Sequence, residues 1–506
     1  MLKLIIWDLD ETLWRGTLAD GDAVALFEDR AALVRGFNAR GVVSSICSKN
    51  DFEPAKRMLV DLGLWDEFVF AHIAFTPKAP AIRKIIDDMQ LRACDVLFVD
   101  DNRLNLEEVR FALPEIQTLD ITQSDADAQL QGLLDGLSGG RSRVEEYRIL
   151  ERKLHDRDSA AGSNEDFLRS CGIKACAPFL MDNLDFAGRI AELINRSNQL
   201  NYTQSRVELA DLEARIIDVV GYDSWSIFAW DRYGHYGLVG FVMVDRVTQA
   251  FVHFVYSCRA MHMGLEAYAL HKVREKWPAI DATRWQDRFS DARPDWIEDC
   301  SFHDPKVRNS LIAEQVTGLA EAPALRIMFD CQSGGIAHFS RHRSRIEFDN
   351  NPRLFALRSV WDGSHVDQAY PSLVVYGAGI DYADPRWGEL ASAIDHGLYR
   401  ECVRRFCAFI EAQGIRALIV LPPDNAADGL YRPHLNHSRD RTIRFNREWW
   451  TAAAQWKCID IVDLSQADGA DMADVSHYRP GLLRELAETI DGWLDAAAAT
   501  SLDRAA

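Results

Sequence analysis

The chain has 506 residues, 48% of them hydrophobic, and this length predicts about three packed domains. A formal net charge of −20 argues against nucleic acid as a general partner, because binding to a phosphate backbone needs a basic surface. Ten scattered cysteines without metal-type C-x-x-C pairs fit reduced thiols in a cytoplasmic protein. We expect neither a signal peptide nor a membrane span, since an acidic motif follows the N-terminus at once and no run of about 18 apolar residues occurs.

The first predicted element is a short apolar strand, Leu4 to Trp7, which leads into Asp8 and Asp10. Such a run is typical of a buried parallel strand, and ligands of these sheets lie outside the carboxyl ends of the strands. Two carboxylates at such an end repel each other unless a cation lies between them, and oxygen ligands suit Mg²⁺. The alternative is a solvated acidic turn.

Two more apolar strands are expected, over Val42 to Ile46 and Val96 to Val99. Helices are expected over Asp51 to Leu62 and over Ala79 to Met89, with Lys78 just before the second. The polar residues after the two strands are Cys47, Ser48, Lys49, Asp100 and Asp101. This order of carboxylate pair, hydroxyl, lysine and second carboxylate pair resembles the haloacid dehalogenase (HAD) superfamily of phosphotransferases over about residues 1–120.

Three motifs narrow the resemblance to the FkbH-like branch: W-D-L-D-E-T-L-W-R-G-T-L, I-C-S-K-N-D and F-V-D-D-N. The resemblance implies a HAD-like Rossmannoid parallel sheet, a Mg²⁺ cofactor and a phosphorylated three-carbon acid, similar to 1,3-bisphosphoglycerate, as substrate. It also implies transfer of a glyceryl-type acyl group to the phosphopantetheine arm of an acyl carrier protein. The net charge does not exclude such a partner, which needs only a local basic patch.

The resemblance also implies roles for single residues. Asp8 matches the aspartyl nucleophile or a phosphate-facing carboxylate, and Asp10 matches the general acid/base. Ser48 and Lys78 match the residues that contact the phosphoryl group, and Lys49 matches a substrate contact. The Mg²⁺ ligands would be Asp8, Asp10, Asp100 and Asp101. Phosphoryl transfer needs little beyond such positioning and charge neutralisation. The alternative for Lys78 is a solvated surface lysine.

Cys47 is the unusual member of this set, because its thiol would lie beside Ser48 at the mouth of the sheet. The nearby Lys49, Lys78 and Mg²⁺ would lower the pKa of the thiol and favour thiolate. A thiolate can attack an acyl phosphate and keep the acyl group as a thioester. The alternative is a buried core cysteine, which is common.

The first domain boundary is expected in the Gly/Ser cluster at Ser138 to Ser142, before a charged helix over Val144 to His155. A helix is then expected over Phe186 to Asn195, with strands over Ser226 to Trp230 and Leu238 to Val244. This middle region resembles the segment that follows the phosphatase-like domain in FkbH-like proteins, which is similar to an N-acetyltransferase (GNAT) fold.

True acetyltransferases bind the pyrophosphate of coenzyme A on backbone N–H groups of a Gly-rich loop that opens a helix. The matching stretch here, Ser257 to Gly264, has one glycine where the usual loop has two. This departure disfavours acetyl-CoA, although Arg259 and Gly264 could accept a phosphopantetheine arm. The alternative is a docking domain without a ligand.

An amide cluster precedes this stretch and matches a T-N-Q-F-N-type segment of the family. Its members are Asn198, Gln199 and Asn201. These amides could bind the hydroxyls of a small polyol acid, or they could cross-link a loop, since buried amides need partners in either case.

The third region begins after a boundary within Thr317 to Pro323. Strands are expected over Leu325 to Phe329, Leu373 to Tyr376, Ala417 to Leu421 and Ile459 to Leu464, with a helix over Leu390 to Gln413. The order of its motifs resembles SGNH (GDSL-type) hydrolases, which implies a flavodoxin-type α/β domain.

In this resemblance Cys331 replaces the nucleophilic serine, and Asp474 would orient His477, which activates the nucleophile. Gly379 matches the third block, where the usual Asn is missing, and would contribute its backbone. Ser333 is a rival nucleophile. The alternative is a degenerate SGNH-like domain used for binding.

Together these patterns predict a cytoplasmic α/β enzyme with a HAD-like domain over 1–140, a GNAT-like α+β domain over 145–318 and an SGNH-like domain over 322–500. It would remove phosphate from the three-carbon acid and pass the acyl group through a cysteine thioester to the carrier protein. Two alternatives stay open: a Mg²⁺-dependent phosphatase with water as acceptor, and a non-catalytic carrier-docking protein. The carrier, the acyl group and the oligomeric state stay open as well.

Overall fold

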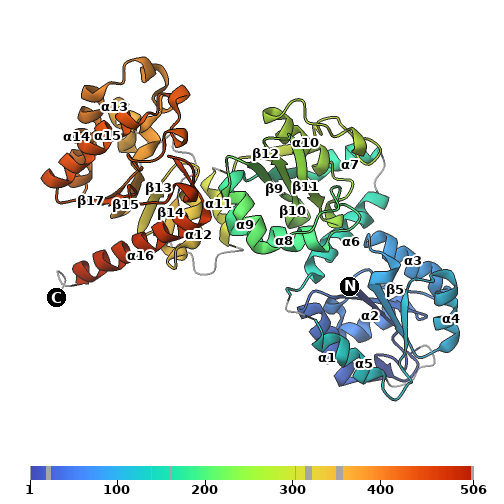
Figure 1. Cartoon of the computed structure of the whole chain (residues 1–506). Helices are drawn as coiled ribbons and strands as arrows, with labels where there is room; N and C mark the ends of the chain where they lie inside the picture. The colour runs from blue at the N-terminus through green and yellow to red at the C-terminus, as the bar shows by residue number, and fades with distance from the viewer. Residues whose placement is uncertain are drawn as a thin grey trace.

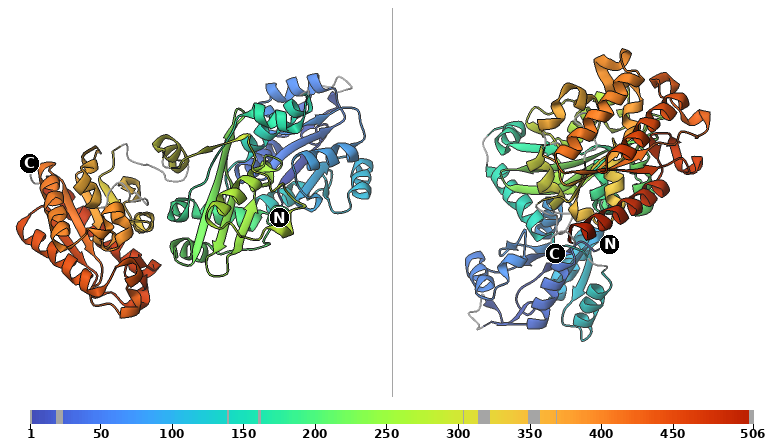
Figure 2. Two further views of the ribbon diagram at one scale, coloured as in Figure 1. Left: turned by 90° about the horizontal axis from the view of Figure 1, so that it is seen from above. Right: turned by 90° about the vertical axis from the view of Figure 1, so that its left-hand side faces the viewer.

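The computed structural model describes residues 2–18, 24–137, 140–159, 162–302, 304–313, 322–348, 357–367 and 369–502. The chain forms three successive lobes, and the middle lobe lies between the other two (Figures 1 and 2). Each lobe contains one five-stranded sheet. The sheets of the first and third lobes are parallel, which confirms the predicted α/β class, whereas the middle sheet is mixed.

The first lobe has the strand order β5-β4-β1-β6-β7. Its strands are β1 Leu4–Trp7, β4 Val43–Ser48, β5 His72–Ile73, β6 Val96–Asp100 and β7 Gln117–Asp120, and a hairpin of β2 Trp14–Arg15 and β3 Ala25–Leu26 follows β1. Its helices are α1 Glu28–Ala39, α2 Phe52–Asp61, α3 Lys78–Asp88, α4 Arg103–Ala112 and α5 Ala126–Asp135. Helices α1, α2 and α5 bury one face of the sheet, and α3 and α4 bury the other. All four residues of β1 are buried, as the apolar run predicts.

Helix α6 Val144–Ser159 links the first and middle lobes (Figure 1). Val144, Tyr147 and Leu150 on this helix pack into the core of the first lobe, whereas Ile149 packs into the core of the middle lobe. The predicted helix from Val144 is therefore confirmed and extends to Ser159. Part of the predicted boundary, residues 138 and 139, lies outside the described residues.

The middle lobe has the strand order β11-β10-β9-β8-β12. Its strands are β8 Ile173–Cys176, β9 Tyr222–Asp231, β10 Gly234–Asp245, β11 Ala250–Tyr256 and β12 Ile297–Cys300. Its helices are α7 Asn164–Cys171, α8 Ala187–Arg196, α9 Leu209–Ile217, α10 Leu265–Lys276 and α11 Pro305–Ala313. The β9–β10 hairpin is longer than the apolar runs within it predict, because polar residues, among them the buried Asp223 and Ser224, continue the strands beyond those runs. After α10 the chain crosses to the opposite edge, where β12 pairs in parallel with β8.

The third lobe has the strand order β14-β13-β15-β16-β17. Its sheet strands are β13 Leu325–Met328, β14 Ile346–Phe348, β15 Leu373–Gly377, β16 Arg416–Leu421 and β17 Ile459–Asp463, and β18 Met472–Asp474 pairs with β19 His477–Tyr478. Its helices are α12 Ser333–Phe339, α13 Leu357–Asp362, α14 His396–Ala412, α15 Arg439–Gln455 and α16 Pro480–Leu502.

One predicted helix of this lobe begins later than expected. The long helix was predicted from Leu390, but α14 starts at His396. Gly388 has φ +56° and ψ −122°, which is not helical, and the Asp395 side chain caps α14 by accepting from the N–H of Leu398 at 2.7 Å. Gly388 lies within the 3₁₀ segment Asp384–Ser392, and Asp395 marks the start of the α-helix after that segment.

The middle and third lobes share one hydrophobic core. Met181 and Leu184 of the middle lobe lie in the same buried cluster as Ile336 and Leu483 of the third. The predicted boundary at Thr317 to Pro323 lies mostly outside the described residues. Over the part of the chain that the structure describes, no helix combines the length and the apolar character needed to cross a membrane.

Candidate active sites

The carboxyl ends of β1 and β6 bring three carboxylates together in the first lobe. Asp8 follows β1, Asp100 ends β6, and Asp101 comes next in the chain. Oxygen atoms of these three side chains all lie within 4.8 Å of one another. Burial, together with the charges of Asp100 and Asp8, raises the pKa of Asp101 to about 6. The three groups repel one another and favour a shared cation.

Lys78, the first residue of α3, lies against two of these carboxylates. Its Nζ is 2.9 Å from Asp8 Oδ2 and 2.5 Å from Asp100 Oδ2, and its side chain is buried. Burial alone would lower the pKa of Lys78, but the two carboxylates raise it above its usual value. The ammonium is therefore part of the site and not a solvated surface group.

The Asp8 carboxylate fits a metal ligand. Its Oδ1 is buried and has no hydrogen-bond partner among the described residues, although buried polar atoms are nearly always bonded. Burial raises the pKa of Asp8 and the charge of Lys78 opposes that shift. An oxygen in this state, beside two more carboxylates, suits a hard cation such as Mg²⁺. The residues present thus fit the predicted cofactor.

Asp10 lies beside this group but not within it. Its carboxylate accepts hydrogen bonds from Trp14 Nε1 at 2.8 Å, from Asn50 Nδ2 at 3.0 Å and from the N–H of Leu18 at 3.1 Å. The structure thus brings three of the four predicted metal-binding carboxylates together, and Asp10 lies next to them with three hydrogen-bond donors on its oxygens. Ser48 is drawn into the same network, because Asn50 Nδ2 also donates to its Oγ at 3.2 Å.

Sequence reasoning missed the amides of this site. Asn105 on α4 donates to both oxygens of Asp100 at 3.2 Å, and it accepts from Lys49 Nζ at 3.0 Å. Asn50 holds Asp10 in a similar way. The sequence feature that could have identified these two amides is their closeness to predicted site residues. Asn50 is the second residue after Ser48, and Asn105 lies in the first turn of α4, shortly after Asp101.

Cys47 is not in the environment that was predicted for a thiolate. It lies inside β4 and packs with Leu4, Ile6 and Phe98 in the core of the lobe. Burial raises the pKa of its thiol to about 12, and the opposing charge of Lys78 is too weak to reverse this. Lys78 alone therefore does not favour the thiolate, and the buried-cysteine alternative describes the surroundings of Cys47, whose predicted catalytic role stays a prediction.

The amide cluster of the middle lobe cross-links its own loop. Asn201 is buried, and its Nδ2 donates to the carbonyls of Ser205 at 2.8 Å and Ile194 at 3.3 Å. Asn198 is exposed and accepts from Arg206 Nη2 at 2.7 Å, and Gln199 is exposed next to it. These three side chains do not line a common cavity among the cavities described. This agrees with the alternative that the amides cross-link a loop.

Arg259 and Gly264 have separate surroundings. Arg259 is buried, forms an ion pair with Glu146 of α6, and donates through Nε to Ser257 Oγ at 3.1 Å. Gly264 has φ +85° just before α10, and a Cβ at this position would lie 3.0 Å from the indole of Trp296. A residue with a Cβ would therefore be strained at this position and would press against the indole.

In the third lobe the structure brings Cys331, Asp474 and His477 together. Nδ1 of His477 lies 2.9 Å from Asp474 Oδ2 and 3.0 Å from Oδ1. Burial alone would lower the pKa of His477, but its hydrogen bonds with Asp474 and with the Cys331 thiol raise it to about 10. The imidazole therefore lies between the thiol of Cys331 and the carboxylate of Asp474.

The rival nucleophile Ser333 is fully buried. Its Oγ donates to the carbonyl of Asp330 at 2.9 Å and accepts from the N–H of Phe329 at 2.7 Å. Cys331, in contrast, lines a cavity of about 300 Å³ together with His477 and Gly379. Asp330 has φ +55°, a left-handed conformation that turns the chain sharply just before Cys331.

No family model and no curated protein matches the chain. Among solved structures, it is similar to the N-terminal part of protein BF1531 from Bacteroides fragilis, which contains a phosphatase domain complexed with Mg. The identity is 23% over 27% of this chain and 41% of that chain, less than half its length, with a TM-score of 0.23.

Two further structures show the same level of likeness. An uncharacterized protein from Corynebacterium glutamicum is 23% identical over 28% of this chain and 99% of that chain, with a TM-score of 0.22. A 3-deoxy-D-manno-octulosonate 8-phosphate phosphatase from Moraxella catarrhalis, in complex with magnesium, phosphate and KDO, is 15% identical over 31% of this chain and 92% of that chain, with a TM-score of 0.18.

Proposed function

We propose that the first lobe catalyses Mg²⁺-dependent phosphoryl transfer in the manner of HAD-type phosphatases. The observation that carries the proposal is the buried Asp8 Oδ1, which has no hydrogen-bond partner and lies beside Asp100 and Asp101. These three residues would hold the Mg²⁺, which supplies charge neutralisation at the phosphoryl oxygens.

Each side chain of the site has one task in this proposal. A carboxylate oxygen of Asp8 forms a bond to phosphorus while the bond to the leaving oxygen breaks. Asp10, held by Trp14 and Asn50, gives a proton to that leaving oxygen. Water then attacks the phosphorylated Asp8, which releases phosphate and restores the carboxylate. Lys78 keeps Asp8 oriented and balances negative charge.

The proposed substrate is a phosphorylated three-carbon acid of the 1,3-bisphosphoglycerate type, as the resemblance to FkbH-like proteins implies. Transfer of its acyl group to an acyl carrier protein would need a reactive thiol within the protein. Burial and a raised pKa disfavour Cys47 in that role. Cys331 has the imidazole partner that Cys47 lacks, which supports an SGNH-like role in thioester chemistry for the third lobe.

For the third lobe we propose acyl transfer from a thioester, and the short contact between His477 and Asp474 favours it. The Cys331 thiolate attacks the thioester carbonyl, and the carbon–sulfur bond to the phosphopantetheine arm breaks. His477 gives its proton to the departing thiol. A second acceptor, an alcohol, a thiol or water, then takes the acyl group from Cys331.

One experiment separates these activities. The full chain with Mg²⁺, a glyceryl acyl phosphate and a holo carrier protein is followed by mass spectrometry and by phosphate release. Acyl-carrier indicates transfer, phosphate release alone indicates a phosphatase, and no change supports a docking protein.

Variants assign the steps to the lobes. Asp8→Asn should lower phosphate release by about three orders of magnitude, while Asp87→Asn, an exposed control, should not. Cys331→Ala should abolish transfer of the acyl group from the carrier thioester to the second acceptor but spare phosphate release, and Cys94→Ala serves as its control. Loss of carrier loading in Cys47→Ala would return the acyl-carrying role to Cys47.

A further inference from the structure

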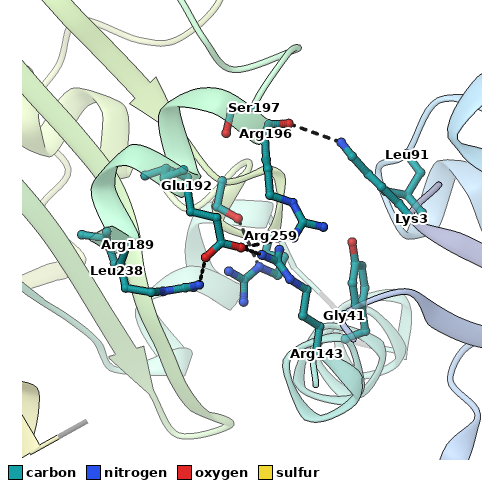
Figure 3. A pocket seen from close by; sticks show the side chains of 13 residues that line it. Lys3, Gly41, Leu91, Arg143, Arg189, Glu192, Arg196, Ser197, Leu238 and Arg259 are labelled. Atoms are coloured by element: carbon teal, nitrogen blue, oxygen red, sulfur yellow. Dashed lines mark hydrogen bonds and ion pairs between the residues drawn. The ribbon is translucent and has the colours of Figure 1, made fainter. Parts of the chain in front are cut away.

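A cationic cavity lies at the junction of the first and middle lobes, away from both candidate active sites (Figure 3). The first lobe contributes Lys3, Gly41 and Leu91, which precede strands β1, β4 and β6. These residues mark the amino edge of the parallel sheet, whereas Asp8 follows β1 at the carboxyl edge. At about 3.3 Å per residue of strand, the cavity lies roughly 15 Å from the carboxylates.

The lining of this cavity is strongly positive. Its cationic side chains are Lys3, Arg143, Arg189, Arg196 and Arg259. Against these five stand three carboxylates: Glu192 in the lining, Glu146 paired with Arg259, and Asp95 paired with Lys3. An excess of two positive charges at one place is unexpected in a chain with a net charge of −20. The excess marks a site for an anion.

One carboxylate serves three guanidinium groups in this cavity. Glu192 forms ion pairs with Arg143 and Arg189 and accepts from Arg196 Nη1 at 3.2 Å, and Figure 3 shows these side chains gathered around it. A carboxylate offers about four lone-pair sites, while each guanidinium has five N–H donors. The donors therefore exceed the acceptors that Glu192 can offer.

The arginines are also largely removed from water. The exposed fraction of the side chain is 6% for Arg259, 17% for Arg143 and 20% for Arg189. Burial, with the charges of Arg196 and Arg259, lowers the pKa of Arg143 to about 10. Cations that are buried together repel one another, and a bound anion would relieve that repulsion.

We propose that this interlobe cavity binds a phosphate group. Guanidinium groups match phosphate geometry with paired N–H donors, and Ser197 and Ser257 add hydroxyls to the lining. The cavity has a volume of about 70 Å³, room for several waters and thus for one tetrahedral oxyanion. The phosphate could belong to a free phosphorylated acid or to the phosphodiester of a phosphopantetheine arm.

Calorimetry of the full chain in EDTA tests the proposal, because EDTA removes the divalent metal that phosphate binding at Asp8 would need. Inorganic phosphate at constant ionic strength is the first probe, and saturable binding with one site per chain is expected. Arg143→Gln and Arg189→Gln should each weaken it at least tenfold. Arg447→Gln, an exposed arginine of α15, is the matched control and should bind like the parent.

Glu192→Gln distinguishes an anion-binding site from a cluster of ion pairs that only stabilises the interface between the two lobes. Removal of this competing carboxylate should tighten phosphate binding severalfold, even if the melting temperature falls. If the cluster only stabilises the interface, the Glu192→Gln variant should be less stable than the parent protein and should not bind phosphate more tightly. Absence of saturable binding, or binding by Arg143→Gln and Arg189→Gln like that of Arg447→Gln, would overturn the proposal.

Two further probes in the same titration identify which kind of ligand carries the phosphate group. Tighter binding of 4′-phosphopantetheine than of inorganic phosphate would identify the arm of a carrier protein. Tighter binding of 3-phosphoglycerate would identify a free phosphorylated acid. Either order supports a phosphate site. Loss of phosphate release in Asp8→Asn is an independent result, so failure of one proposal leaves the other standing.

Discussion

Lys78 is the residue on which the first site depends most. Its ammonium lies between Asp8 and Asp100, so that three charged groups are buried as one unit. Such a unit stabilises a protein only while it is complete, because loss of one member leaves uncompensated charge in the interior.

Lys78→Met is therefore expected to destabilise the metal-free protein by about 3–5 kcal/mol, measured as the free energy of unfolding in urea. Added Mg²⁺ should recover part of this loss, since a cation returns to the two carboxylates. Lys84→Met removes an exposed lysine of the same helix, whose ion pair with Asp88 lies at the surface, and should cost about 1 kcal/mol or less. Equal effects of the two substitutions would contradict the buried unit.

The reactivity of the cysteines should differ sharply. We expect iodoacetamide to modify Cys331 before the buried Cys47, Cys402 and Cys407, because only Cys331 of these four lines a cavity beside an imidazole. Peptide mass spectrometry after short exposure gives the order, and His477→Gln should slow the modification of Cys331. Preferential labelling of Cys47 in the folded protein would contradict the burial described here.

His477 also predicts a pH dependence of stability. Its folded pKa of about 10 lies above the ordinary value near 6.5, so protonation favours the folded state. The contribution is complete below about pH 6.5 and is lost as the pH rises through about 10. The difference in unfolding free energy between the parent and His477→Gln should therefore be larger near pH 6.5 than above pH 10. A difference that grows with pH would reverse the sign of this argument.

Among single residues, the members of the carboxylate site could be predicted from the sequence, whereas the surroundings of Cys47 and the role of Asn105 could not. The motif order identified Asp8, Lys78 and Asp100 as one site, because strand ends of a parallel sheet meet at one edge. The surroundings of Cys47 were not predictable, because the strand continues two residues past its apolar run and the pleat decides which side chains face the core. The amide of Asn105 reaches Asp100 only once α4 has formed.

At the level of elements, buried strands were the easiest to predict. Leu4–Trp7 matches its apolar run, and Arg416–Leu421 differs from its predicted range by one residue. The strand pairings of the mixed sheet were harder to predict. No local sequence pattern places β12 beside β8, because tertiary packing across the middle lobe brings these two strands together. The start of α14 was placed too early, since helical periodicity alone does not show that the residues up to Ser392 form a 3₁₀ segment and that Asp395 caps the α-helix.

The cap of α14 can be tested directly. Asp395→Ala should lower the free energy of unfolding by about 1 kcal/mol, because the first turn loses the acceptor for the N–H of Leu398. Glu389→Ala changes an exposed residue within the 3₁₀ segment and should be nearly neutral. If the α-helix instead began at Leu390, Asp395 would be interior and its replacement by alanine would stabilise the helix.

At the scale of the whole molecule, the linker helix α6 belongs to the first lobe as much as to the second. Val144, Tyr147 and Leu150 cover apolar core of the first lobe. A fragment of residues 1–159 should therefore unfold cooperatively, while a fragment of residues 1–140 should have a lower melting temperature and expose apolar surface. Calorimetry with a hydrophobic dye measures both. Equal melting temperatures would place the boundary before α6.

Strand β1 joins two regions that have been described separately. It is short and wholly buried, with Lys3 in the interlobe cavity at one end and Asp8 among the carboxylates at the other. A displacement of β1 would move both ends together, because its four residues pair with β4 and β6 as one segment. If an anion bound at the junction changes the affinity for the metal by some factor, thermodynamic linkage requires that the metal changes the affinity for the anion by the same factor. The junction would thus serve as an effector site for the chemistry at the far end of the strand.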